Sequence, residues 1–228
     1  KAPRQAYKIL RFGGGLMEIR AQDILLSMFN PDDTVCFRVF DDKKNGVFSG
    51  AKLEAEAGKF ASIEPALKSH NEKDRGIFYV VNYGGHEDSS ISRINAQFVE
   101  MDDLSFEEQH RAVDAFPLPP SMIIKTRKSL HVYWFVKNAK IEAFRPIQKQ
   151  LVAHFHGDPM CVNESRVMRL PGFNHCKKDR RFCRHWVTSL WRSSAAVRKA
   201  LKFSFTAVIL SSTAVKMQRP FQSMTGMQ

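Results

Sequence analysis

Two carboxylates at the end of an apolar stretch are the first residues here that could do chemistry. The stretch begins at Ala96 and runs through Phe98 to Glu100 and Asp102. Side chains alternate along a strand, so Glu100 and Asp102 are predicted to share one face about 7 Å apart. A divalent cation would offset their repulsion, and oxygen ligands suit Mg²⁺ or Mn²⁺. The alternative is a strand end whose acids face water.

A second group of candidate residues lies around a strand expected at 130–136. Arg127, Ser129 and His131 follow one another at intervals of two residues, so they can point to one face of an extended chain. A guanidinium, a hydroxyl and an imidazole on one face form a cradle for phosphate oxygens. A histidine on a strand can also serve as a structural partner of its neighbours.

The third group consists of an acid followed by two arginines. Asp158 precedes Arg166 and Arg169, which stand three residues apart with two apolar residues between them. Arginines in so apolar a setting need anionic partners. A triphosphate or the acids of a metal site would serve, and so would a structural salt bridge. Lys177 and Lys178 extend the positive charge.

Helices and strands are predicted to alternate along the chain, which favours an α/β or α+β fold. Periodicity predicts helices at 21–28, within 51–67, near 106–116 and at 141–155, and strands at 35–40, 76–81, 96–103, 122–124 and 130–136.

Length and composition indicate a globular protein. The 228 residues, 43% of them hydrophobic, suit one domain or two closely packed modules. The sequence begins with Lys1, so we expect a trimmed chain or a piece of a longer one. It shows no signal peptide, its apolar run at 203–215 is too short to span a bilayer, and its four cysteines form no dense framework. We therefore expect a reduced, cytoplasmic protein with no membrane partner.

Positive charge is concentrated near the end of the sequence. The net charge is +12, and the 49 residues from 180 onward hold nine lysines and arginines and no acid. Such a region favours a polyanion such as nucleic acid, although a solubilising tail would look the same. Arg180, Arg181 and Arg184 are the candidate DNA contacts, and Trp186 and Trp191 could stack on unpaired bases.

The order of the three groups carries a resemblance to a known family. An acid-x-acid strand end, a Ser-x-His strand and an Asp followed by paired arginines together resemble the archaeo-eukaryotic primase, or primase-polymerase, superfamily. The stretches GIFYVVNYGG at 76–85, SLHVYW at 129–134 and RVMRLPGF at 166–173 further resemble the RepB-like primase domains of plasmids and phages. The resemblance covers roughly residues 20–190.

The resemblance implies an α/β (α+β) fold with an RNA-recognition-motif-like core. The core would contain a mixed sheet and follow a smaller N-terminal α/β module. The expected parts are a basic segment at 1–20, a catalytic domain at 21–190 with modules at about 21–95 and 96–190, and a basic region of unknown structure at 191–228.

The resemblance also implies an activity and roles for residues. The activity would be template-directed nucleotidyl transfer on single-stranded DNA from nucleoside triphosphates, making primers for plasmid or phage replication. A replicative helicase is a candidate partner. Two Mg²⁺ or Mn²⁺ ions would be held by Glu100, Asp102 and Asp158, with Asp103 as an alternative to Asp102. The catalytic set would be these acids with His131. The nucleotide-binding set would be Arg127, Ser129, His131, Arg166, Arg169 and Lys177.

Three other interpretations stay open on the sequence. One is a non-catalytic, DNA-binding replication module with the same fold. Another is a rolling-circle nuclease, because His154 and His156 flank an apolar residue, although no tyrosine nucleophile follows them. The last is a zinc site formed by His175, Cys176, Cys183 and His185.

Overall fold

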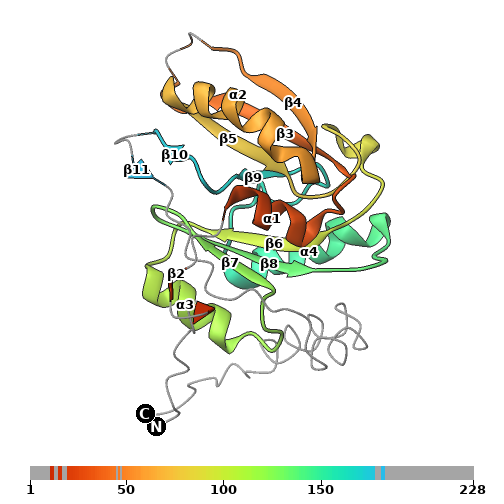
Figure 1. The fold of residues 1–228 in the computed structure, drawn as a ribbon. Coiled ribbons are helices and arrows are strands. Elements are labelled where there is room, and N and C mark those ends of the chain that lie inside the picture. Colours follow the sequence, from red (N-terminus) through yellow and green to blue (C-terminus); the bar gives the residue numbers. More distant parts are fainter. Residues whose placement is uncertain are drawn as a thin grey trace, which may run out of the picture. The chain divides into compact units, whose positions relative to one another are not determined.

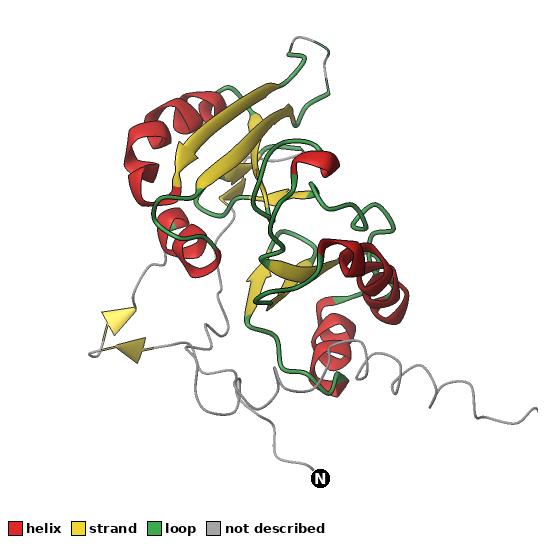
Figure 2. Ribbon diagram, turned by 90° about the vertical axis from the view of Figure 1, so that its right-hand side faces the viewer, coloured by secondary structure: helices red, strands yellow, loops and turns green. Residues whose placement is uncertain are grey.

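The computed structural model describes residues 11–12, 15–16, 20–44, 46, 48–177 and 181–182. The chain divides into two compact units, 1–192 and 193–228, and all described residues belong to the first. The expected C-terminal region at 191–228 lies outside them, as does most of the segment 1–20. The described part forms two larger antiparallel sheets with four α-helices (Figures 1 and 2).

The larger sheet has four strands in the order β4-β3-β5-β9. Its strands are β3 (Thr34–Asp41), β4 (Ala51–Glu56), β5 (Arg75–Val80) and β9 (Val167–Arg169). Helix α2 (Phe60–Glu72) packs against this sheet because Phe60, Ile63 and Leu67 recur at helical spacing and are buried (Figure 1). Helix α1 (Ala21–Met28) buries Ile24 and Leu25.

The smaller sheet has three strands in the order β6-β8-β7. They are β6 (Ala96–Met101), β7 (Met122–Lys125) and β8 (Leu130–Phe135). Helix α3 (Phe106–Ala115), which begins with a capping box between Ser105 and Glu108, connects β6 to β7. Helix α4 (Ile141–Phe155) follows β8. This β-α-β-β-α order is a split βαβ arrangement, as expected of an RNA-recognition-motif-like core.

The expected α/β fold is confirmed, with a difference in strand direction. Every pairing among the described strands of both sheets is antiparallel, whereas a mixed sheet was expected. The split βαβ order explains this, because β6 and β7 run parallel to each other but β8 lies between them. The stretch 51–67 also differs, since Ala51–Glu56 is a strand and the α-helix begins only at Phe60.

The two sheets share one hydrophobic core. Phe37 and Tyr79 from the larger sheet belong to the same buried cluster as Phe98, Tyr133 and Phe144 from the smaller sheet and α4. Strand β9 also joins them, because it comes from the second half of the chain and pairs with β5.

Shorter elements complete the described chain. They are β1 (Arg11–Phe12), β2 (Gly15–Leu16), η1 (Ala57–Lys59), η2 (Asp88–Ser90), β10 (Asn174–His175) and β11 (Arg181–Phe182). Among the described helices, none has the length and apolar character that crossing a membrane requires.

Candidate active site

Glu100 and His131 face each other across two strands of the smaller sheet. They are register partners on β6 and β8, and Glu100 Oε1 lies 3.2 Å from His131 Nε2. Ser129, just before β8, donates its hydroxyl to the same oxygen at 3.2 Å. Ser129 and His131 were expected to share a face, and in the structure both side chains contact the carboxylate of Glu100.

The carboxylate of Glu100 is held in its charged form. Burial raises its pKa, but His131, Ser129 and Arg166 outweigh burial and bring the pKa down to about 2. His131 Nδ1, on the other side of the ring, is buried and has no hydrogen-bond partner within the described chain. This nitrogen therefore keeps an unused capacity for hydrogen bonding.

Asp158 reaches Glu100 because the chain turns sharply after α4. His156 adopts a left-handed conformation with φ of 50°, and Gly157 then packs against β6. A Cβ at Gly157 would lie 2.4 Å from Val99 Cγ2, so only glycine fits this approach. The amide of Asp158 donates to the carbonyl of Glu100 at 2.8 Å, which fixes the loop on the open edge of β6.

The carboxylate of Asp158 is held by a guanidinium and a backbone amide, and it lies close to two other potential ligands. Arg166 Nη2 lies 2.8 Å from Oδ2, and the Met160 amide donates to Oδ1 at 2.9 Å. Ligand atoms of Glu100, Asp158 and Cys161 all lie within 4.8 Å of one another. Two carboxylates this close, one of them with a depressed pKa, fit a hard divalent cation.

Asp102 lies apart from this pair. Strand β6 ends at Met101, and the carboxylate of Asp102 pairs with Lys128, whose Nζ is 2.5 Å from Oδ2. Asp102 is not in the group that converges within 4.8 Å. Asp103 is exposed and lies in the loop that follows. The structure therefore brings Glu100 and Asp158 together and leaves Asp102 in an ion pair at the strand end.

The nucleotide-binding candidates fall into two places. Ser129, His131 and Arg166 converge on Glu100 and Asp158, as described above. Arg169 instead forms a buried pair with Asp42, with two hydrogen bonds of 3.0 Å. The Cys176 amide also donates to the Asp42 carboxylate at 3.0 Å. For Arg169, the structure therefore shows a structural salt bridge, one of the alternatives that the sequence allowed.

Arg127 and Lys177 gather near His175. Burial lowers the pKa of His175, and Arg169, Lys177 and Arg127 lower it further, to about 4, against the opposing effect of Asp42. A neutral imidazole beside these cations is consistent with a surface that accepts negative charge.

Several sequence candidates lie outside the described residues. The side chains proposed to contact DNA are among them, because Arg181 is described by its backbone alone, and Arg180 and Arg184 are not described. The same holds for Cys183 and His185 of the zinc interpretation.

Three residues with contacts to the predicted site residues were not among the sequence candidates. Cys161 follows Asp158 by three residues, a spacing that could have marked it as a neighbour in a tight turn. Lys128, the partner of Asp102, lies 26 residues along the chain from it. Asp42 is 127 residues from Arg169, and no local pattern signals that pair.

Comparison with known proteins finds similarity to primases. Residues 85–192 match the family described as the RepB DNA-primase N-terminal domain. No curated protein matches.

Three solved structures share the fold. The AEP domain of the cyanophage S-2L primase-polymerase is 24% identical with a TM-score of 0.64, over 78% of this chain and 94% of that one. The catalytic domain of primase RepB′ in complex with initiator DNA is 15% identical with a TM-score of 0.56, over 89% and 100%. A second structure of primase RepB′ is 18% identical with a TM-score of 0.55, over 87% and 68%. Together, the family match and the shared fold confirm that this chain resembles the archaeo-eukaryotic primase superfamily and its RepB-like primase domains.

Proposed function

We propose that this chain is a DNA primase or primase-polymerase. It would join nucleoside triphosphates in the order set by a single-stranded DNA template and so make primers for plasmid or phage replication. The observation that carries the proposal is the convergence of Glu100 and Asp158 on the open edge of β6, beside His131 and Arg166. That one RepB′ structure contains initiator DNA supports a DNA template as partner.

The acids would supply the metal site of this reaction. Glu100 and Asp158 would hold Mg²⁺ or Mn²⁺, with Asp102 as a further ligand and Asp103 as its alternative. Bound there, the cations would activate the primer 3′-hydroxyl and neutralise charge on the phosphates. Asp102 would have to exchange its ion pair with Lys128 for this role, which would free the lysine for a phosphate oxygen.

The remaining residues would bind and orient the incoming nucleotide. Glu100 holds Nε2 of His131, which fixes the ring and leaves Nδ1 for a phosphate oxygen. Arg166 contacts Asp158 and lowers the pKa of Glu100, so it balances the acids and lies close to where the phosphates would bind. Ser129 contributes a hydroxyl at the same carboxylate, and Arg127 and Lys177 would widen the positive surface.

Replacement of Asp158 tests this proposal. Asp158→Ala should abolish primer synthesis on a single-stranded template, measured with labelled ribo- and deoxyribonucleotides and either cation, because half of the converging acid pair is lost. Glu107→Ala is the matched control, since Glu107 is exposed on α3 and pairs with Arg111 on the same helix. Asp102→Ala and Asp103→Ala, compared in the same assay, would identify the third ligand.

Two results would contradict the assignment. One is Asp158→Ala activity within a few-fold of wild type while circular dichroism is unchanged. The other is a wild-type protein that binds single-stranded DNA but incorporates no nucleotide with either cation. The second result would favour the non-catalytic replication module.

A further inference from the structure

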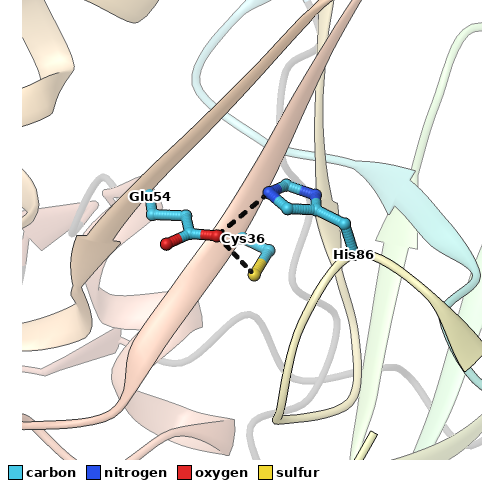
Figure 3. Close-up of side chains that lie close together, drawn as sticks. All are labelled: Cys36, Glu54 and His86. Atoms are coloured by element: carbon cyan, nitrogen blue, oxygen red, sulfur yellow. Dashed lines mark hydrogen bonds and ion pairs between the residues drawn. The ribbon is translucent and has the colours of Figure 1, made fainter. Parts of the chain in front are cut away.

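Three potential metal ligands meet on the larger sheet, away from β6 and β8. Cys36 on β3 and Glu54 on β4 are direct register partners, and His86 comes from the glycine-rich loop after β5 (Figure 3). Their ligand atoms all lie within 4.8 Å of one another. Cys36 is buried, and the side chain of His86 is 12% exposed. No part of the proposed primase chemistry uses these residues.

The distances from Glu54 to the other two ligand atoms match those of a tetrahedral metal site. Glu54 Oε1 lies 3.7 Å from Cys36 Sγ and 3.3 Å from His86 Nε2. Ligands at ordinary zinc distances and tetrahedral angles would be separated by about 3.6 Å for sulfur and oxygen and about 3.4 Å for nitrogen and oxygen. The side chains would therefore need little movement to bind one ion.

The imidazole of His86 lacks the hydrogen bonds that a buried ring normally has. Both of its nitrogens are buried, and neither has a hydrogen-bond partner among the residues that the structure describes. Nε2 nevertheless points toward Glu54, as Figure 3 shows. A buried polar atom without a partner is costly, and a metal ion at this point would satisfy Nε2.

The loop that carries His86 is held in place by its surroundings. Gly84 has φ of 142°, and a Cβ there would lie 2.1 Å from the carbonyl oxygen of Ser90, so the loop can take this path only with glycine. Arg38 donates to the carbonyl of His86. His86 is thus presented to Cys36 and Glu54 by a fixed backbone.

The basic side chains beside this cluster pair with a different acid, Glu87. Lys52 Nζ lies 2.8 Å from Glu87, and Arg38 lies 3.8 Å from the same carboxylate. Glu87 thereby offsets the two positive charges nearest the cluster, and the carboxylate of Glu54 stays directed at Cys36 and His86.

We propose that Cys36, Glu54 and His86 form a zinc site. Sulfur, nitrogen and oxygen donors in tetrahedral spacing are the ligand set of zinc, whereas Mg²⁺ and Mn²⁺ prefer oxygen alone. Three protein ligands leave a fourth position for water, and Glu54, whose side chain is 54% exposed, places it near solvent. The ion would tie β3, the edge strand β4 and the loop 82–86 together.

Metal titration of the full chain tests the site. The protein, freed of metal with a chelator, should bind one equivalent of Co²⁺ with a thiolate-to-cobalt charge-transfer absorption, and Zn²⁺ should displace it. Cys36→Ala should abolish that absorption, and Glu54→Gln and His86→Ala should weaken Zn²⁺ binding at least tenfold. Zn²⁺ should also raise the melting temperature of wild type but not of these variants.

Matched variants separate this site from the others that the chain offers. Glu56→Gln, on the same strand as Glu54, removes an acid that pairs with Lys59 and should bind Zn²⁺ like wild type. Cys183→Ala removes a ligand of the zinc interpretation at 175–185, and Cys161→Ala removes the thiol beside Glu100 and Asp158; both should keep the charge-transfer absorption. The proposal is overturned if the absorption survives in Cys36→Ala or disappears in Cys183→Ala or Cys161→Ala. Glu54→Gln changes an exposed side chain, so unchanged affinity in that folded variant would also overturn it.

Discussion

Glu100 keeps its charge in a largely buried position because its neighbours compensate for lost hydration. Its pKa falls from 4.5 to about 2 through His131, Ser129 and Arg166, against the opposing effect of burial. A folded-state pKa below the unfolded value means that the folded state favours the ionised form. This contribution to stability is fully present above about pH 5, and it is lost as the pH falls toward 2.

Glu100→Gln should therefore change how stability depends on pH. By proton linkage, wild type should lose about 2 kcal/mol between pH 7 and pH 3 through this carboxyl group, and the variant should not. Urea unfolding of both proteins at the two pH values measures this effect. The difference in the free energy of unfolding between wild type and the variant should be smaller at pH 3 than at pH 7. Glu107→Gln, an exposed acid on α3, is the control whose difference from wild type should not shrink. An equal wild-type-to-Glu100→Gln difference at both pH values would argue against the depressed pKa.

At the scale of elements, β6 is an edge strand, and the side chain of Gln148 binds its free backbone groups. Phe98 and Glu100 direct their backbone groups away from β8. Gln148 on α4 accepts from the Phe98 amide at 3.3 Å and donates to the carbonyls of Phe98 and, at 2.8 Å, of Cys161. Gln148 thus takes the place of a neighbouring strand, and it links β6 to the loop that carries Asp158.

Gln148→Leu should be strongly destabilising. The change is nearly isosteric, but it leaves three buried backbone groups without their partner, at an expected cost of about 3 kcal/mol or more. Urea unfolding would measure it, and hydrogen exchange at the Phe98 amide should accelerate. Gln150→Leu on the same helix is the control, because Gln150 Oε1 has no hydrogen-bond partner in the described part of the chain. Its cost should stay below about 1 kcal/mol, and equal costs would mean that Gln148 merely fills space.

Sequence periodicity predicted most elements because packing follows it closely here. The helices predicted at 21–28 and 141–155 have those bounds in the structure, and the strands predicted at 122–124 and 130–136 are β7 and β8 to within one residue. The stretch 51–56 is different because its Ala, Leu, Lys and Glu residues favour a helix, and pairing with β3 overrides that preference.

The site was predictable only where it depends on strand alternation. Ser129 and His131 are two residues apart, so their shared face could be anticipated, whereas their meeting with Glu100 depends on the pairing of β6 with β8. Arg166 and Arg169 looked like a pair, but positions three apart on extended chain point to opposite faces, and the two arginines meet different acids. Neither the Arg169–Asp42 pair nor the Cys36–Glu54–His86 cluster could be derived without knowing which strands are neighbours.

At the scale of the whole molecule, charge is distributed unevenly along the chain. Acids and bases alternate over much of the described part, and many form ion pairs such as Lys59–Glu56 and Lys68–Glu64. From residue 180 onward there is no acid to pair with the nine lysines and arginines. A segment of one charge sign favours binding to phosphates, and counterion release then makes the affinity depend on salt.

The joint replacement of Arg180, Arg181 and Arg184 by alanine tests whether this segment meets the template. Affinity for single-stranded DNA should fall steeply with salt, with a slope near −0.7 per neutralised phosphate, so losing three contacts should flatten the slope by about two units. Nucleotide transfer onto a saturating preformed primer should largely survive, because the converging acids are untouched. The joint change of Lys59, Lys68 and Lys73 to alanine removes the same charge around α2 and should leave the slope near that of wild type. If both triple variants flatten the salt slope equally, the effect comes from net charge alone. If only the lysine variant flattens the slope, DNA binds the face of α2.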